Sequence, residues 1–72
     1  MENLTIDARG LSCPQPVLMA RQAISGLTAG TVEILVDSVT SCENISRFAK
    51  TSGWNAITEQ TPSGDYRVVL ER

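Results

Sequence analysis

The sequence predicts an α+β two-layer sandwich in the order βαβαββ, with two helices on one face of a four-stranded mixed sheet. Stretches rich in β-branched residues alternate with stretches whose apolar residues recur at helical spacing. Turn chemistry at Pro62-Ser63-Gly64 joins the last two strands as an antiparallel hairpin. Right-handed crossovers place both helices on the same face and leave the other face open. The 72 residues are enough for one domain, which we assign to 1–72.

The four strands are predicted from alternation and β-propensity. Leu4–Asp7 alternates apolar and polar residues, and Thr31–Val36 is rich in β-branched residues. Asn55–Thr61 and Asp65–Glu71 flank the turn and form the predicted hairpin. A loop from Ala8 to Ser12 follows the first strand.

The first helix is predicted to begin at Pro14, because proline lacks an N–H that the first helical position does not need. Glycines near Leu27 indicate its end. The residues that fall on its inward face are Val17, Ala20, Ile24 and Leu27, with Ala23 at the edge. Leu18 and Met19 fall outside this face. We therefore predict that these two apolar residues are exposed and form a partner-docking surface.

The second helix is predicted from the capping-box spacing of Thr40 and Glu43, and from Gly53 as its stop after Ser52. Its inward face consists of Cys42, Ile45, Phe48 and Ala49.

Composition excludes several classes of function. The net charge is −2 and no basic stripe is present, so direct binding of nucleic acid is not expected. Histidine is absent, and the two cysteines have neither zinc-ligand spacing nor a Cys-x-x-Cys motif, so no metal or cofactor is expected. The start of the sequence resembles neither a signal peptide nor a membrane span, which predicts a cytoplasmic protein with reduced thiols.

Cys13 is the candidate reactive residue. With Pro14 at the first helical position, Cys13 becomes the N-cap, where free N–H groups and the helix dipole favour a thiolate. Arg9 is a candidate source of further positive charge. The alternative is a small cysteine buried under the helix. The flanking prolines and the Leu18–Met19 pair favour a functional thiol.

The runs Asp7-Ala8-Arg9-Gly10-Leu11 and Cys13-Pro14-Gln15-Pro16 resemble the TusA/SirA/YedF family of small sulfur-carrier proteins. The resemblance covers the whole chain and implies the same βαβαββ fold. It also implies a persulfide relay, in which the motif cysteine accepts sulfur from a donor such as a cysteine desulfurase and passes it to an acceptor protein. The resemblance therefore implies that Cys13 is the catalytic residue of a sulfurtransferase of this kind. The matching motif supplies its support: Arg9, Gly10, Pro14, Gln15 and Pro16.

The stretch Glu43–Ala49 resembles the YedF-like branch rather than the members that thiolate tRNA. The donor, the acceptor and the end product stay open among thiolated tRNA, cofactors, and selenium or sulfur metabolism. Cys42 has no counterpart in the family motif, and its inward position favours packing over a role as a resolving thiol. Two alternatives remain beside the sulfur carrier: a protein-interaction module, and a thiol-redox or selenium-handling module.

Overall fold

The computed structural model describes residues 3–11 and 15–72. Within them the chain forms four strands and two helices in the predicted order: β1 (Asn3–Asp7), α1 (Gln15–Ser25), β2 (Thr31–Val36), α2 (Val39–Thr51), β3 (Asn55–Gln60) and β4 (Tyr66–Glu71). The first, third and fourth strands each differ from the prediction by one residue at one end. The predicted start of the first helix at Pro14 lies outside the described residues.

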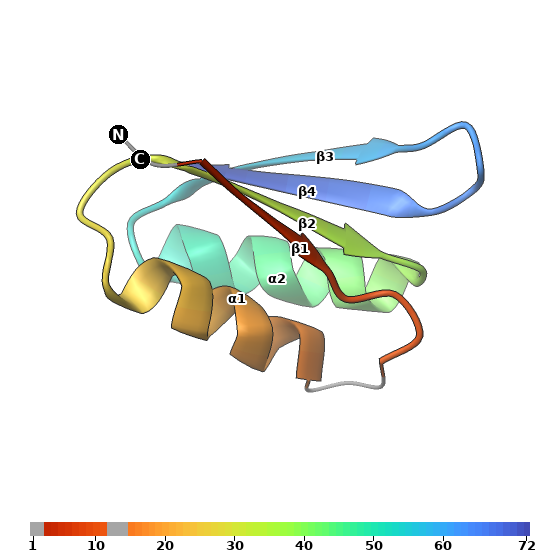
Figure 1. The fold of residues 1–72 in the computed structure, drawn as a ribbon, viewed down its shortest axis with the longest axis horizontal. Coiled ribbons are helices and arrows are strands. Elements are labelled where there is room, and N and C mark those ends of the chain that lie inside the picture. Colours follow the sequence, from red (N-terminus) through yellow and green to blue (C-terminus); the bar gives the residue numbers. More distant parts are fainter. Residues whose placement is uncertain (1–2, 12–14) are drawn as a thin grey trace.

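The strands form one mixed sheet in the spatial order β1-β2-β4-β3. β1 pairs with β2 in parallel, while β4 pairs antiparallel with both β2 and β3. The last strand of the chain therefore lies between β2 and β3, at the centre of the sheet (Figure 1). β1 and β3 are the two edge strands.

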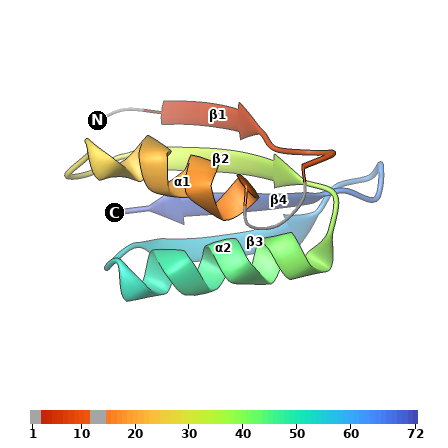
Figure 2. The same ribbon diagram turned by 90° about the horizontal axis from the view of Figure 1, so that it is seen from below.

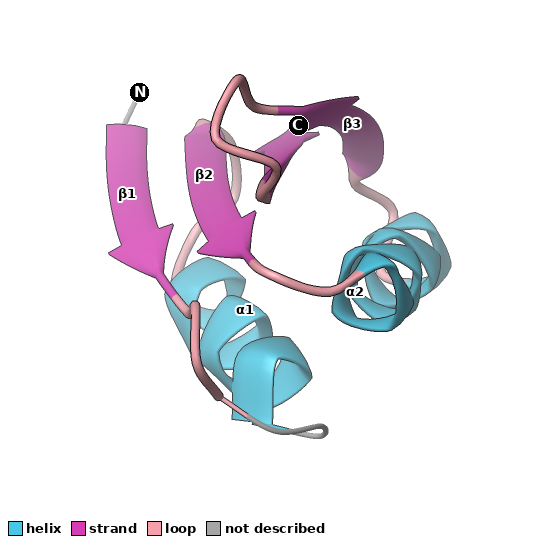
Figure 3. Cartoon of the chain, turned by 90° about the vertical axis from the view of Figure 1, so that its right-hand side faces the viewer, coloured by secondary structure: helices cyan, strands magenta, loops and turns pink. Residues whose placement is uncertain are grey.

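Both helices lie on one face of the sheet, which confirms the two-layer prediction (Figures 2 and 3). Alternate side chains of β2 and β4 point to the helices and are fully buried; they are Val32, Ile34, Val36, Val68 and Leu70. Against them pack the buried side chains of α1 and α2, which include Ala20, Ile24, Ile45 and Ala49. Each large aliphatic side chain removed from water in this way contributes roughly 1.5–3 kcal/mol.

The end of α2 agrees with the sequence. The N–H of Gly53 donates to the carbonyl of Lys50 at 3.2 Å, and the N–H of Trp54 donates to that of Ala49 at 2.8 Å. This pair of bonds is a Schellman motif, which requires a left-handed residue, and Gly53 has φ +85°. The motif turns the chain so that Trp54 is buried at 4% exposure over the end of the helix.

The predicted start of α2 is wrong by two residues. The N-cap is Ser38, whose backbone is extended and whose Oγ accepts the N–H of Ser41 at 3.1 Å. Thr40 is inside the first turn, so it forms no capping box with Glu43. Ser38 caps the helix because the chain leaves β2 at Val36 and must begin the helix at once.

The described part of α1 ends at Ser25, two residues before the predicted limit. The N–H of Leu27 still donates to the carbonyl of Ile24 at 3.0 Å, so a turn continues the helix beyond its last regular residue. Leu27 packs against the core as predicted.

Candidate functional site

The loop that follows β1 lies at the end of the sheet where β1 and β2 finish and both helices begin (Figure 1). Since β1 and β2 are parallel, the loops that leave them meet at this edge. The described residues of the sequence motif lie here, Arg9 and Gly10 in the loop and Gln15 and Pro16 at the start of α1. Cys13 and Pro14 lie outside the described residues, and so does the predicted N-cap geometry.

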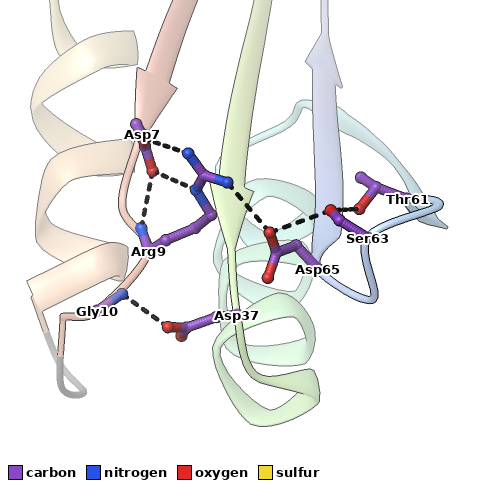
Figure 4. A network of polar contacts seen from close by, with 7 residues as sticks. All are labelled: Asp7, Arg9, Gly10, Asp37, Thr61, Ser63 and Asp65. Carbon is purple, nitrogen blue, oxygen red and sulfur yellow. Dashed lines mark hydrogen bonds and ion pairs between the residues drawn. The ribbon is translucent and has the colours of Figure 1, made fainter.

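Arg9 is held by two carboxylates. Its Nε and Nη2 donate to Asp7 at 2.9 and 2.8 Å, and its Nη1 donates to Asp65 Oδ2 at 3.1 Å (Figure 4). The backbone N–H of Arg9 also donates to Asp7 Oδ1 at 3.1 Å. The positive charge of Arg9, which the sequence analysis offered as a support for a Cys13 thiolate, is therefore balanced by two ion pairs.

These contacts change the acidity of both partners. The side-chain and backbone hydrogen bonds from Arg9 lower the pKa of Asp7 to about 2. The same pairing, together with Asp65, raises the pKa of the Arg9 guanidinium. Arg9 is thus a structural cation that ties the loop to the β3–β4 hairpin.

Gly10 has a different partner. Its N–H donates to Asp37 Oδ2 at 2.7 Å, and its φ of +80° is a conformation that side chains with a Cβ rarely adopt. Asp37 is the first residue after β2. Sequence reasoning missed both Asp37 and Asp65. For Asp37 a signal was present, because the residue after a strand parallel to β1 must lie at the same edge as the loop.

The hairpin side of the network is also polar. Ser63 Oγ lies 3.0 Å from Thr61 Oγ1 and 3.4 Å from Asp65 Oδ2 (Figure 4). The N–H of Thr61 donates to the carbonyl of Asp65 at 2.7 Å and closes the turn. The β3–β4 turn therefore presents Asp65 to Arg9 from a turn closed by its own hydrogen bonds.

The first turns of α1 carry the remaining predicted residues. Gln15 is exposed, while Pro16 is fully buried and anchors the start of the helix on the core. Leu18 is 45% exposed, in agreement with its predicted place off the inward face. Met19 is placed differently from the prediction, because it is half-buried and packs against the core. Its long flexible side chain reaches apolar contacts from the margin of the inward face.

Cys42 lies on the inward face of α2 as predicted and is 5% exposed. Its thiol also lines a groove between α2 and β3, beside Ser46 and Thr58. Burial raises the pKa of this thiol, and the charge of Glu43 raises it further. A protonated, buried thiol is a poor nucleophile, which agrees with a packing role.

Within residues 3–11 and 15–72, no three His, Cys, Asp or Glu side chains gather closely enough to hold a metal ion. No helix in the described part of the chain has the length and apolar content needed to cross a bilayer.

Comparison with known proteins gives consistent matches along the chain. The family model described as "Sulfurtransferase TusA" matches residues 4–72. A protein of Methanocaldococcus jannaschii named "Putative sulfur carrier protein" is 31% identical over 68 residues, which are 93% of this chain and 91% of that protein. The crystal structure of a SirA-like protein from Desulfitobacterium hafniense superposes with a TM-score of 0.89 at 33% identity, over 94% of this chain and 95% of that one.

Proposed function

The chain belongs to the TusA family of sulfurtransferases, and from this membership we propose that it accepts persulfide sulfur on Cys13 and relays it to an acceptor protein. The motif Cys13-Pro14-Gln15-Pro16 supports this assignment. In the proposal the 72 residues act as one domain in the cytoplasm, where thiols are kept reduced.

The proposed transfer is a displacement at sulfur. The Cys13 thiolate attacks the outer sulfur of a donor persulfide, a new S–S bond forms on Cys13, and the donor's own S–S bond breaks. The donor cysteine leaves as a thiolate, so no external oxidant or reductant is needed. The acceptor repeats the step on the Cys13 persulfide, with Cys13 as the leaving group. A cysteine desulfurase is a suitable donor because it forms a persulfide of this kind.

The observation that supports Cys13 over the second thiol is the burial of Cys42 and its raised pKa. A carrier thiol must reach the sulfur of each partner in turn, and a thiolate reacts where a thiol does not. Cys42 meets neither condition. The motif cysteine is the remaining candidate.

Mass spectrometry tests this proposal after anaerobic incubation with a cysteine desulfurase and cysteine. We expect the wild-type protein and Cys42→Ser to gain the mass of one sulfur, which a reducing agent removes. Cys13→Ser should gain none. An unmodified wild-type protein would favour the protein-interaction module instead. A sulfur adduct on Cys42 would show that Cys42, and not Cys13, is the carrier thiol.

A further inference from the structure

The parallel pairing of β1 and β2 continues past the end of β1. Asp7 lies opposite Leu35, and the N–H of Ala8 donates to the carbonyl of Leu35 at 2.8 Å. In a parallel ladder every second N–H of one strand donates to its neighbour. The next donor in this alternation is Gly10, and the next acceptor is the backbone carbonyl of residue 37.

The side chain of Asp37 takes the place of that carbonyl. Its Oδ2 accepts the N–H of Gly10 at 2.7 Å (Figure 4). The backbone has already left the sheet here, because Ser38 is the N-cap of α2. The carboxylate therefore adds one rung to the ladder where the strand itself has ended.

This rung completes the anchoring of the loop. Three consecutive N–H groups have partners: that of Ala8 on Leu35, that of Arg9 on Asp7, and that of Gly10 on Asp37. The Gly10 bond is the last of the three before Cys13 in the sequence and, at 2.7 Å, the shortest.

The other end of the motif is also fixed. Pro16 is fully buried, and Leu11 packs against the core beyond Gly10. Cys13 lies three residues after Gly10 and three before Pro16 in the sequence. The described residues on both sides of Cys13 are therefore held in place, Gly10 by Asp37 and Pro16 by the core.

We propose that Asp37 is a positioning residue for sulfur transfer, which holds Gly10 and thereby fixes the approach of the chain to Cys13. This inference rests on the proposed function. Asp37 does not react with sulfur. It acts through the backbone, so what matters is an oxygen that accepts a hydrogen bond rather than a negative charge.

Two substitutions separate these properties. Asp37→Ala removes the acceptor and the charge, whereas Asp37→Asn removes the charge and keeps an oxygen acceptor. Glu71→Ala is the matched control. It also removes an exposed carboxylate, but Glu71 pairs with Thr31 at the start of β2, whereas Asp37 follows the end of that strand. The measurements are the rate constant for sulfur uptake from a persulfidated desulfurase at saturating donor, the KM for the donor, and hydrogen exchange of the Gly10 amide.

We expect Asp37→Ala to lower the saturating rate constant about tenfold or more, because a reacting group misplaced by about 1 Å loses up to roughly 10²-fold in rate. The KM should stay unchanged and the Gly10 amide should exchange faster. Asp37→Asn should recover most of the rate, and Glu71→Ala should behave as wild type.

A wild-type rate in a folded Asp37→Ala variant would overturn the positioning role while leaving the proposed function intact. An Asn variant as slow as the Ala variant would overturn it too, because charge would then be the property that matters. A wild-type protein that takes up no sulfur would overturn the proposed function and the positioning role together.

Discussion

Arg9 and Asp65 join two segments that are 56 residues apart in the sequence, with 3.1 Å between Nη1 and Oδ2. One belongs to the loop before the motif, and the other to the turn between β3 and β4. The loop after β1 and the β3–β4 turn are thus connected beyond the carboxyl end of β1.

The Arg9 ion pairs lead to a prediction on acidity. In Arg9→Gln the pKa of Asp7 should rise from about 2 towards the ordinary 3.8, because the hydrogen bonds that favour the carboxylate are gone. A lowered pKa stabilises the fold above the ordinary pKa. That stabilisation is therefore lost as the pH falls from about 4 to about 2. Carboxyl NMR titration measures the shift directly.

The control for this experiment is Arg67→Gln. Arg67 is another half-exposed guanidinium on the sheet, paired with Glu59 and Glu33. Its removal should leave the titration of Asp7 unchanged. An Asp7 that titrates near 3.8 in the wild-type protein would contradict the ion pair seen here.

The start of α2 gives a prediction on stability. Ser38→Ala should lower the free energy of unfolding by about 1 kcal/mol, since the Ser41 N–H loses its acceptor. Thr40→Ala is the matched variant, a small exposed hydroxyl two residues away, and should have almost no effect. Urea unfolding of both variants measures the difference. The reverse ranking would restore the cap that the sequence predicted.

The sequence predicted the element order, the two-layer arrangement and the inward faces of both helices, because these follow from local periodicity. It could not predict that β4 lies between β2 and β3, since the strand order depends on contacts between distant segments. Local sequence favoured Thr40 as the cap of α2, because Glu43 follows it at capping-box spacing. The structure has Ser38 instead, because the chain leaves β2 at Val36 and the helix begins directly afterwards.

The candidate site divides in the same way. The motif around Cys13 was found from residue types in a short run. Asp65 was not, because nothing in its own neighbourhood marks it as a partner of Arg9. Asp37 was missed although it directly follows β2, because its pairing with Gly10 depends on β1 and β2 lying side by side. Met19 was misplaced since a residue at the margin of a helical face is buried or exposed according to what packs beside it.

Leu18 lies off the inward face of α1, at 45% exposure, two residues after Pro16 in the sequence. Its side chain contributes little to the core, so burial within this domain does not explain an apolar residue there. Exposed apolar side chains beside a reactive group are typical of a docking surface. Isolated ones are also common on protein surfaces, so a matched comparison is needed. Ile57 provides it, because it is 52% exposed and lies in β3, in the other layer.

We expect Leu18→Glu to raise the KM for a persulfidated donor about tenfold, which corresponds to about 1.4 kcal/mol of lost binding. Ile57→Glu should leave the KM unchanged, and both variants should unfold at nearly the wild-type urea concentration. Met19→Glu is unsuitable for this test because Met19 packs against the core, and a charge there would destabilise the fold. Equal effects of Leu18→Glu and Ile57→Glu would mean that added negative charge, rather than a lost contact, weakens docking. A wild-type KM in Leu18→Glu would place the docking surface elsewhere.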